Sequence, residues 1–316
     1  MKHLFEVVNR IFAFIVPISD FLWNFPKGID AYAQIPVLGQ FSFAMLLLVG
    51  TGIYFTVRMG AVQFRRFAQS IRIVSVRTAS ETGISPFAAF MLSSAMRVGP
   101  GNIMGVTGAV SVGGPGAVFW MWVAAAFGMA TGFVEATLAQ LFKEKKDDQY
   151  VGGLPFYGMK LLGNRRWVGV SLSALFISYA LLNVPSQTFH LFTALGSAAS
   201  TIAGTTLART SGTYYVIGLF LIVTIASLVL GGMKRVVRFT DICVPVMAVL
   251  YCGVVAVLIL LNFRLIPYFL KAVVGGAFSP GAVFGGAFGV ALQQGIKRGL
   301  MANEAGQGTI TNAPIP

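Results

Sequence analysis

A glycine- and proline-rich phrase interrupts an apolar run that is long enough to cross a membrane. The phrase is Met-Arg-Val-Gly-Pro-Gly-Asn-Ile at residues 96–103, within an apolar stretch from about Pro86 to Val112. Pro100 removes a backbone donor and clashes with the preceding helical turn, and glycines accept backbone angles that other residues avoid. We therefore expect residues 98–102 to be non-helical inside an otherwise helical span. A kink that serves only helix packing is the alternative interpretation.

A helix that is broken inside a membrane can bind charged groups through its backbone. The start of one half-helix presents N–H groups and the end of the other presents carbonyls, and hydrocarbon tolerates both only where protein or a wet cavity surrounds them. The N–H groups suit a carboxylate and the carbonyls suit a cation. The break therefore predicts a site that binds an anionic group and a cation together.

Five polar side chains fall within or beside the apolar segments: Arg97, Glu135, Asn183, Gln187 and Glu304. Ionisable groups are costly inside a bilayer and usually face a partner, a cavity or a transport pathway. Arg97 and Glu135 either form a buried ion pair that holds helices together or act directly in transport. Asn183 and Gln187 share a helical face if the turn survives Pro185. Interhelical hydrogen bonding and substrate contact are both open for these two amides.

Composition indicates an all-α polytopic membrane protein. Hydrophobic residues make up 56% of the 316 residues and charged residues 10%, and the mean hydropathy is +0.78. A soluble domain carries about 25% charged residues. The chain has two histidines, and its two cysteines, Cys243 and Cys252, lie in one apolar run. These residues supply no converging nucleophile, base or metal set, so we expect no catalytic residues, no enzyme activity and no cofactor.

Apolar runs and charged loops divide the chain into segments. We expect an amphipathic, interfacial segment at residues 1–36 and a first, peripheral span at 37–57. Later spans are expected at 86–112, 117–142, 167–195, 214–230 and 242–261, followed by an interfacial helix after Asn262 and a glycine-rich segment at 282–295.

Positive charges alternate between the two sides of these spans. Basic residues concentrate in the loop at 58–77, in the KEKKDDQ segment at 143–149 with the residues up to Arg166, and in the loop at 234–238. The positive-inside rule places these loops in the cytoplasm and the N-terminus outside. The net charge of +13 thus reflects topology, and we expect no nucleic-acid partner.

Three stretches of the chain resemble the alanine or glycine:cation symporter family, which moves small amino acids into cells with sodium. They are SSAMRVGPGNIMGVTGAVSVGGPGAVFWMWVAAAFGMATGFVEATLAQLF at 93–142, GGLPFYGMKLLG at 152–163 and KRGLMANEAGQGT at 297–309. The resemblance implies a LeuT-type core, in which five helices are repeated in inverted topology. Residues 86–262 would form the first repeat and residues 263–316 the start of the second. Because family members continue beyond the position of Pro316, we expect a C-terminally truncated chain with an incomplete second repeat.

The resemblance also implies roles for individual residues. Gly99, Gly101 and Asn102 would form the substrate-binding break, and Gln187 would contact the substrate. Val98 and Gly101 would contribute a partial sodium site. Asn303, Glu304, Ala305 and Gly306 match the family's Asn-Glu-Ala-Gly signature near the start of the second repeat.

The leading hypothesis is sodium-coupled symport of a small neutral amino acid, alanine or glycine, into the cell by alternating access. The expected partners are that amino acid, sodium as the coupling ion and the lipid bilayer, and the oligomeric state is open. A proton-coupled carrier of the same fold and a non-transporting fragment or scaffold are the alternatives. Sodium dependence of uptake discriminates between the two couplings.

Overall fold

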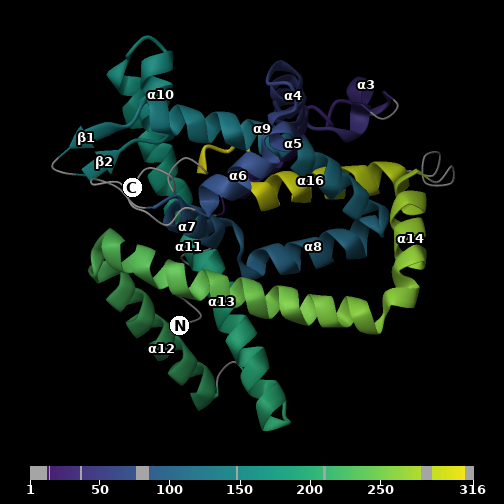
Figure 1. Cartoon of the computed structure of the whole chain (residues 1–316). Coiled ribbons are helices and arrows are strands. Elements are labelled where there is room, and N and C mark those ends of the chain that lie inside the picture. Colours follow the sequence, from purple (N-terminus) through teal and green to yellow (C-terminus); the bar gives the residue numbers. More distant parts are fainter. Residues whose placement is uncertain are drawn as a thin grey trace. The chain divides into compact units, whose positions relative to one another are not determined.

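The computed structural model describes residues 13, 15–35, 38–75, 85–146, 149–208, 211–278 and 287–309. These residues are mostly helical (Figure 1), which confirms the helical part of the predicted fold class. The charged segment at 143–149 differs from the expected loop, because it contributes to two short antiparallel strands, β1 (Glu144–Lys146) and β2 (Gln149–Val151). The side chains of this segment are hydrophilic, and the segment connects two apolar helices in the sequence. Water can solvate the outer edges of such a hairpin.

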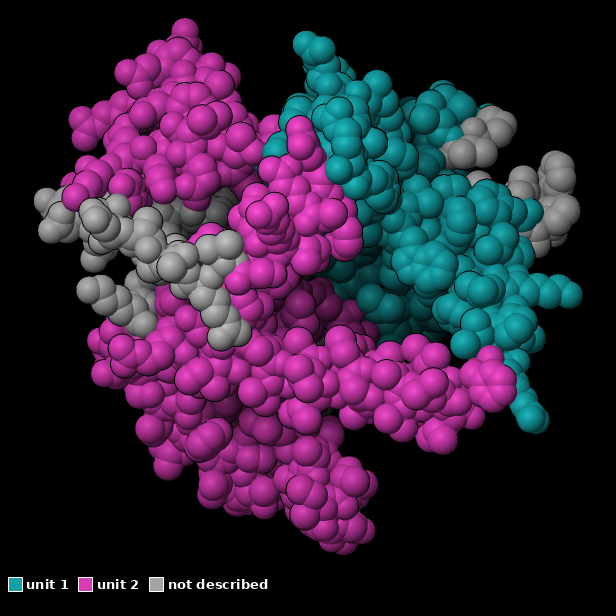
Figure 2. Space-filling model, in the orientation of Figure 1, with its two compact units in different colours: residues 1–65, 106–133, 264–306 teal, residues 66–105, 134–263, 307–316 magenta. Residues whose placement is uncertain are grey.

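Contacts group the chain into two compact units, each assembled from segments that are distant in sequence (Figure 2). Unit 1 comprises residues 1–65, 106–133 and 264–306, and unit 2 comprises residues 66–105, 134–263 and 307–316. Each unit therefore depends on contacts between distant segments as well as on contacts between consecutive helices. The division into inverted repeats at 86–262 and 263–316 stays a prediction.

Unit 1 contains the N-terminal helices among the described residues, the end of the broken helix, the first part of a long helix and the last two described helices. Its elements are α2 (Ile15–Asn24), α3 (Asp30–Ala33), η1 (Leu38–Gln40), α4 (Phe43–Arg58), α5 (Val62–Arg65), the greater part of α8 (Pro100–Gly113), the first part of α9 (Gly116–Leu141), α14 (Ile266–Phe278) and α16 (Ala287–Asn303). The turn η2 (Phe263–Leu265) leads into α14.

Small residues let α9 and α16 approach each other closely inside unit 1. A Cβ added at Gly295 would lie 2.6 Å from the Cβ of Trp120, and one added at Gly299 would lie 2.8 Å from the Cβ of Ala124. The two glycines are four residues apart on α16, the spacing that allows helix backbones to pack tightly in membranes. Ala124 also packs with Leu292, Ile296 and Leu300 in the buried cluster at this contact.

Unit 2 contains the other half of the broken helix and most of the long apolar helices. Its elements are α6 (Phe67–Val74), α7 (Pro86–Arg97), the start of α8, the end of α9, strands β1 and β2, α10 (Leu154–Leu161), α11 (Arg166–Ala203), α12 (Gly212–Leu230) and α13 (Gly232–Leu261). Ala88 and Leu92 of α7 pack against Val237 of α13 in a buried cluster. This packing anchors the helix that ends at the break.

Four of the described helices are long and apolar enough to cross a membrane: α9, α11, α12 and residues 235–261 of α13. They agree with the spans predicted at 117–142, 167–195, 214–230 and 242–261. The helix α11 is longer than its predicted span, because it continues through Pro185 as one helix of 38 residues. The predicted first span corresponds to α4, which is shorter, with 16 residues. Residues 282–286 of the glycine-rich segment predicted at 282–295 lie outside the described residues.

The close contact between α9 and α16 predicts opposite effects for two glycine-to-alanine changes. Alanine is the better helix former by about 1 kcal/mol, so Gly253→Ala on α13, where an added Cβ meets nothing within 4 Å, should leave stability unchanged or raised. Gly295→Ala should lower it, because overpacking typically costs about 1–3 kcal/mol. Thermal unfolding midpoints in detergent micelles measure both variants. Equal midpoints would contradict the close contact.

Candidate functional site

The predicted break lies between α7 and α8, and it is narrower than expected. Val98 is extended, with φ −98° and ψ 93°, and Gly99 is also non-helical, whereas α8 begins at Pro100. The break therefore covers residues 98 and 99 rather than 98–102. Proline at the first helical position lacks an N–H that would have no helical partner there, and its fixed φ suits the helix. Gly101 and Asn102 thus continue into the first turn of α8.

The side chain of Asn102 holds the two half-helices together. Its Nδ2 donates a hydrogen bond to the carbonyl of Arg97, the last residue of α7. Its backbone N–H donates to the carbonyl of Gly99 at 2.9 Å. A carbonyl without a partner costs several kcal/mol in hydrocarbon. Asn102 therefore stabilises the break, a role in addition to the predicted substrate contact.

Gln187 of α11 lies directly beside the two glycines of the break. A Cβ added at Gly101 would lie 3.2 Å from the Oε1 of Gln187, and one added at Gly99 would lie 3.5 Å from the same atom. Glycine, which has no Cβ, is the one residue type that leaves the space between this backbone and Gln187 open. The structure thus brings Gly99, Gly101 and Gln187 together inside unit 2, and their predicted contact with a substrate stays a prediction.

A line of polar side chains on α11 orients the amide of Gln187. The Nε2 of Gln187 donates to the Oδ1 of Asn183 at 3.2 Å, and the Nδ2 of Asn183 donates to the hydroxyl of Tyr179. Residues spaced by four lie on one helical face, so Asn183 and Gln187 share a face despite Pro185. The Nε2 of Gln187 donates to a neighbour on the same helix, and the oxygen of Gln187 is the amide atom nearest both glycines. The break therefore has a hydrogen-bond acceptor aimed at it.

His190 is a neighbour of the break that the sequence analysis missed. Its Cδ2 lies 3.5 Å from the position of a Cβ on Gly101, and its buried Nδ1 has no hydrogen-bond partner among the described residues. Buried polar atoms usually have partners. The available signal was its spacing, because a residue three positions after Gln187 lies on the same side of a helix.

Glu135 has a structural partner in the C-terminal motif. Glu135 is 9% exposed, and its Oε1 accepts a hydrogen bond from the N–H of Gly308 at 2.9 Å. Gly308 has φ +75°, an angle that favours glycine. Hydrogen bonding is what makes a buried charge tolerable. This contact supports the structural interpretation of Glu135, and the proposed ion pair with Arg97 stays a prediction.

The Asn-Glu-Ala-Gly signature forms the turn that ends α16 in unit 1. The Oδ1 of Asn303 accepts a hydrogen bond from the N–H of Ala305 at 3.1 Å. Glu304 and Gly306 both have positive φ, 55° and 81°, which reverses the chain direction after the helix. Asn303 also packs against Gly128 of α9. The signature thus has a local folding role, while the break belongs to unit 2.

The predicted sodium ligands occupy different backbone environments. Val98 is extended, so its carbonyl lies outside both helices. Gly101 lies in the first turn of α8, where a carbonyl points along the helix and an N–H points toward the helix start. The sodium-binding roles of Val98 and Gly101 stay predictions. Among the described residues no group of three His, Cys, Asp or Glu side chains could hold a metal ion.

Comparison with known proteins identifies the family. The model of the sodium:alanine symporter family matches residues 30–314. The chain belongs to this family. Its members are symporters rather than enzymes, and the family suggested by the sequence motifs is confirmed. Together with the apolar helices, membership makes the chain part of a multi-pass membrane protein.

The chain is similar to several curated members of the family. It is 39% identical to the amino-acid carrier protein AlsT of Bacillus subtilis, over 93% of this chain and 57% of that protein. It is 40% identical to the probable sodium/glutamine symporter GlnT of the same organism, over 85% of this chain and 54% of GlnT. It is 35% identical to the sodium/alanine symporter AgcS of Methanococcus maripaludis, over 86% of this chain and 59% of AgcS. The chain therefore spans a little over half the length of these relatives.

The bond between Asn102 and Arg97 predicts a stability loss in a leucine variant. Leucine has a similar size to asparagine but no donor, so Asn102→Leu leaves the carbonyl of Arg97 without this bond, at a cost of about 1–3 kcal/mol. Asn262→Leu is the matched control, because the Nδ2 of Asn262 donates to the Leu258 carbonyl at an exposed helix end. Thermal unfolding should show the larger drop for Asn102→Leu. Equal drops in the unfolding midpoint would contradict the stabilising role of Asn102 at the break.

Proposed function

We propose that these residues form part of the substrate site of a symporter that carries a small neutral amino acid into the cell with sodium. The observation that carries the proposal is the juxtaposition of the break at residues 98 and 99, the start of α8 and the oxygen of Gln187. An amino acid is a zwitterion, so its site needs donors for the carboxylate and acceptors for the ammonium group. The break and α11 offer both kinds of group in one place.

The start of α8 suits the carboxylate. The helix dipole places partial positive charge at the start of a helix, which favours a negatively charged group there. Gly101 lies in the first turn of α8 and has no Cβ to keep a ligand away from the backbone. We assign the carboxylate to the N–H side of Gly101, with Gly99 providing the open approach.

The oxygen of Gln187 suits the ammonium group. The hydrogen bonds through Asn183 to Tyr179 engage the Nε2 of the amide, and Oε1 is the amide atom nearest both glycines. An amide oxygen that is fixed before the ligand arrives binds it with less ordering of the side chain. Gln187 would therefore recognise the part of the substrate that every α-amino acid shares.

The narrow space around Gly101 favours a small substrate side chain. Gln187 and His190 both lie within 3.5 Å of the position of a Cβ on Gly101. Relatives carry names that refer to alanine and to glutamine, so neutral amino acids are the wider class. Within that class we propose alanine or glycine as the substrate, moved by alternating access.

Sodium is the proposed coupling ion, with the carbonyl of Val98 as one ligand of its site. Proton coupling is the second candidate, and His190 favours it because an ionisable ring with a buried nitrogen stands beside the break. A relative from Bacillus sp. PS3, 37% identical over 76% of this chain and 51% of its own length, is named a sodium/proton-dependent alanine carrier. Alanine uptake driven by a sodium gradient at equal pH, compared with a pH gradient without sodium, distinguishes the two.

The proposed site predicts that a branched side chain at Gly101 blocks uptake. Gly101→Val places atoms against Gln187, whereas Gly108→Val, on the same helix, meets nothing within 4 Å at its Cβ. One misplaced methyl group in a tight pocket changes rates by about tenfold or more. Sodium-driven uptake of labelled alanine into vesicles, in the intact protein carrying these residues, should fall by about this factor for Gly101→Val alone. Equal uptake by the two variants at equal surface expression would place the substrate elsewhere.

The proposed orientation predicts which loops can be labelled from outside. The segment at 143–149 should be cytoplasmic, and both the N-terminus and the loop around Ser211 should be external. In a background with Cys243→Ser and Cys252→Ser, a membrane-impermeant maleimide should label Thr206→Cys in intact cells. It should label Lys145→Cys only after the membrane is permeabilised. The reverse pattern would invert the topology.

A further inference from the structure

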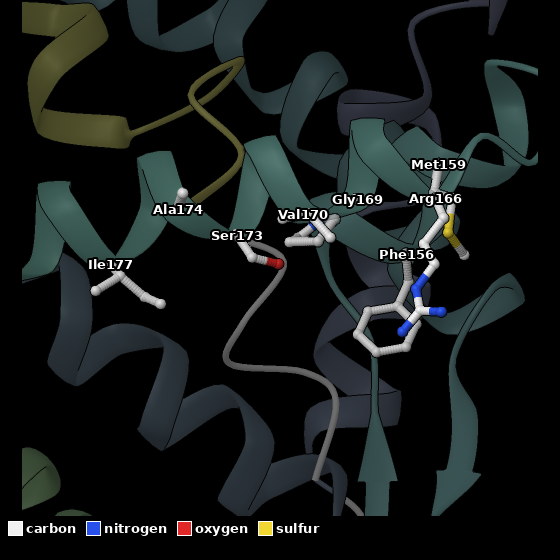
Figure 3. Close-up of a pocket in the computed structure, with 9 residues that line it drawn as sticks. Phe156, Met159, Arg166, Gly169, Val170, Ser173, Ala174 and Ile177 are labelled. Atoms are coloured by element: carbon white, nitrogen blue, oxygen red, sulfur yellow. The ribbon is translucent and has the colours of Figure 1, made fainter.

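A groove between α10 and the first half of α11 lies apart from the residues of the break. It has a volume of about 400 Å³. Its lining, drawn in Figure 3, includes Phe156 and Met159 of α10 and Arg166, Val170, Ala174 and Ile177 of α11. All of them belong to unit 2, and none takes part in the polar line from Tyr179 to His190. The α10 side comes from the GGLPFYGMKLLG segment, for which the transport proposal has no role.

The groove is amphipathic along its length. The residues from α11 recur at successive turns on one face of the helix, from Arg166 to Ile177. Figure 3 shows the Arg166 side chain beside Phe156 and Met159 at one end, and Ile177 at the other end. Between these ends the side chains that line the groove are apolar or small. A ligand that fits has a negatively charged head and a slender apolar tail.

The position of the groove matches one leaflet of a bilayer. Arg166 is the first residue of α11, and the next residue, Trp167, is 65% exposed. Arginine and tryptophan at a helix end mark the membrane interface. From Arg166 to Ile177 a helix rises about 16 Å, which is about half of the 30 Å hydrocarbon core. The apolar part of the groove therefore has the length of one acyl chain.

We propose that this groove binds one anionic phospholipid. The phosphate lies at Arg166, and one acyl chain lies along α11 toward Ile177. Nearby Lys160 is bonded to Glu144 at 2.6 Å, which leaves Arg166 as the cation at the polar mouth of the groove. A neighbouring helix or a second copy of the chain could cover the apolar wall, but neither needs a cation at the interface. The proposal depends on the membrane location of the chain and not on the transport proposal.

Native mass spectrometry of the purified full chain tests the proposal. The probes are phosphatidylglycerol and phosphatidylcholine with identical palmitoyl-oleoyl chains. The variant Arg166→Gln removes the charge, with Arg165→Gln as its control, since Arg165 does not line the groove. The variant Ala174→Trp fills the groove, with Leu175→Trp as its control, since Leu175 is 66% exposed and lies outside the lining.

We expect one molecule of phosphatidylglycerol to be retained in preference to phosphatidylcholine. Arg166→Gln should weaken retention of phosphatidylglycerol about fivefold without changing that of phosphatidylcholine. Ala174→Trp should weaken retention of both lipids, and the two controls should match the unchanged chain. Excess inorganic phosphate should not displace the lipid, because the acyl chain contributes to binding.

Several results would overturn the proposal. Equal retention of the two lipids, equal loss in Arg166→Gln and Arg165→Gln, or displacement by inorganic phosphate would each do so. If a variant fails to fold, cross-linking of a lipid to the unchanged chain still tests the proposal. Phosphatidylglycerol with a photoreactive acyl chain must then cross-link to residues 155–177, and cross-links confined to other segments, or only to a second copy, would refute the site.

Discussion

The fold around the break depends on one constraint, which is that backbone groups inside hydrocarbon need hydrogen-bond partners. The chain meets this constraint at residues 98 and 99 with two local devices. Pro100 starts α8 without an N–H, and Asn102 reaches back to the carbonyl of Arg97. These devices keep the break short, so the start of α8 stays close to the end of α7. The position of Gly101 beside Gln187 follows from that geometry.

The helix α11 positions both of the binding sites that we propose. Its first half carries the stripe from Arg166 to Ile177, and its second half carries the polar line that ends at Gln187 and His190. A site built on a continuous helix is held more precisely than one built on loops. Pro185 lies within the polar line but does not end the helix. The proposed substrate site and the proposed lipid groove therefore share one helix.

Much of the fold could be predicted from the sequence, because hydropathy and proline and glycine placement act locally. The long apolar helices and the location of the break follow from such signals, and the family follows from long motifs. The expected break is too long because Pro100 starts α8 instead of interrupting a helix, and Asn102 lies in its first turn. His190 and the orientation of Gln187 depend on how α11 lies against the break, a tertiary contact that spacing alone does not specify. The partner of Glu135, the N–H of Gly308, is likewise far away in sequence.

The central claim is that the break and Gln187 together bind the backbone of an amino acid. A high-resolution structure of the intact protein with bound alanine tests this claim most directly. We expect the alanine carboxylate within about 3 Å of the N–H of Gly101 and the ammonium group within about 3 Å of the oxygen of Gln187. Alanine bound at another place, with the contact between Gly101 and Gln187 unchanged, would contradict it.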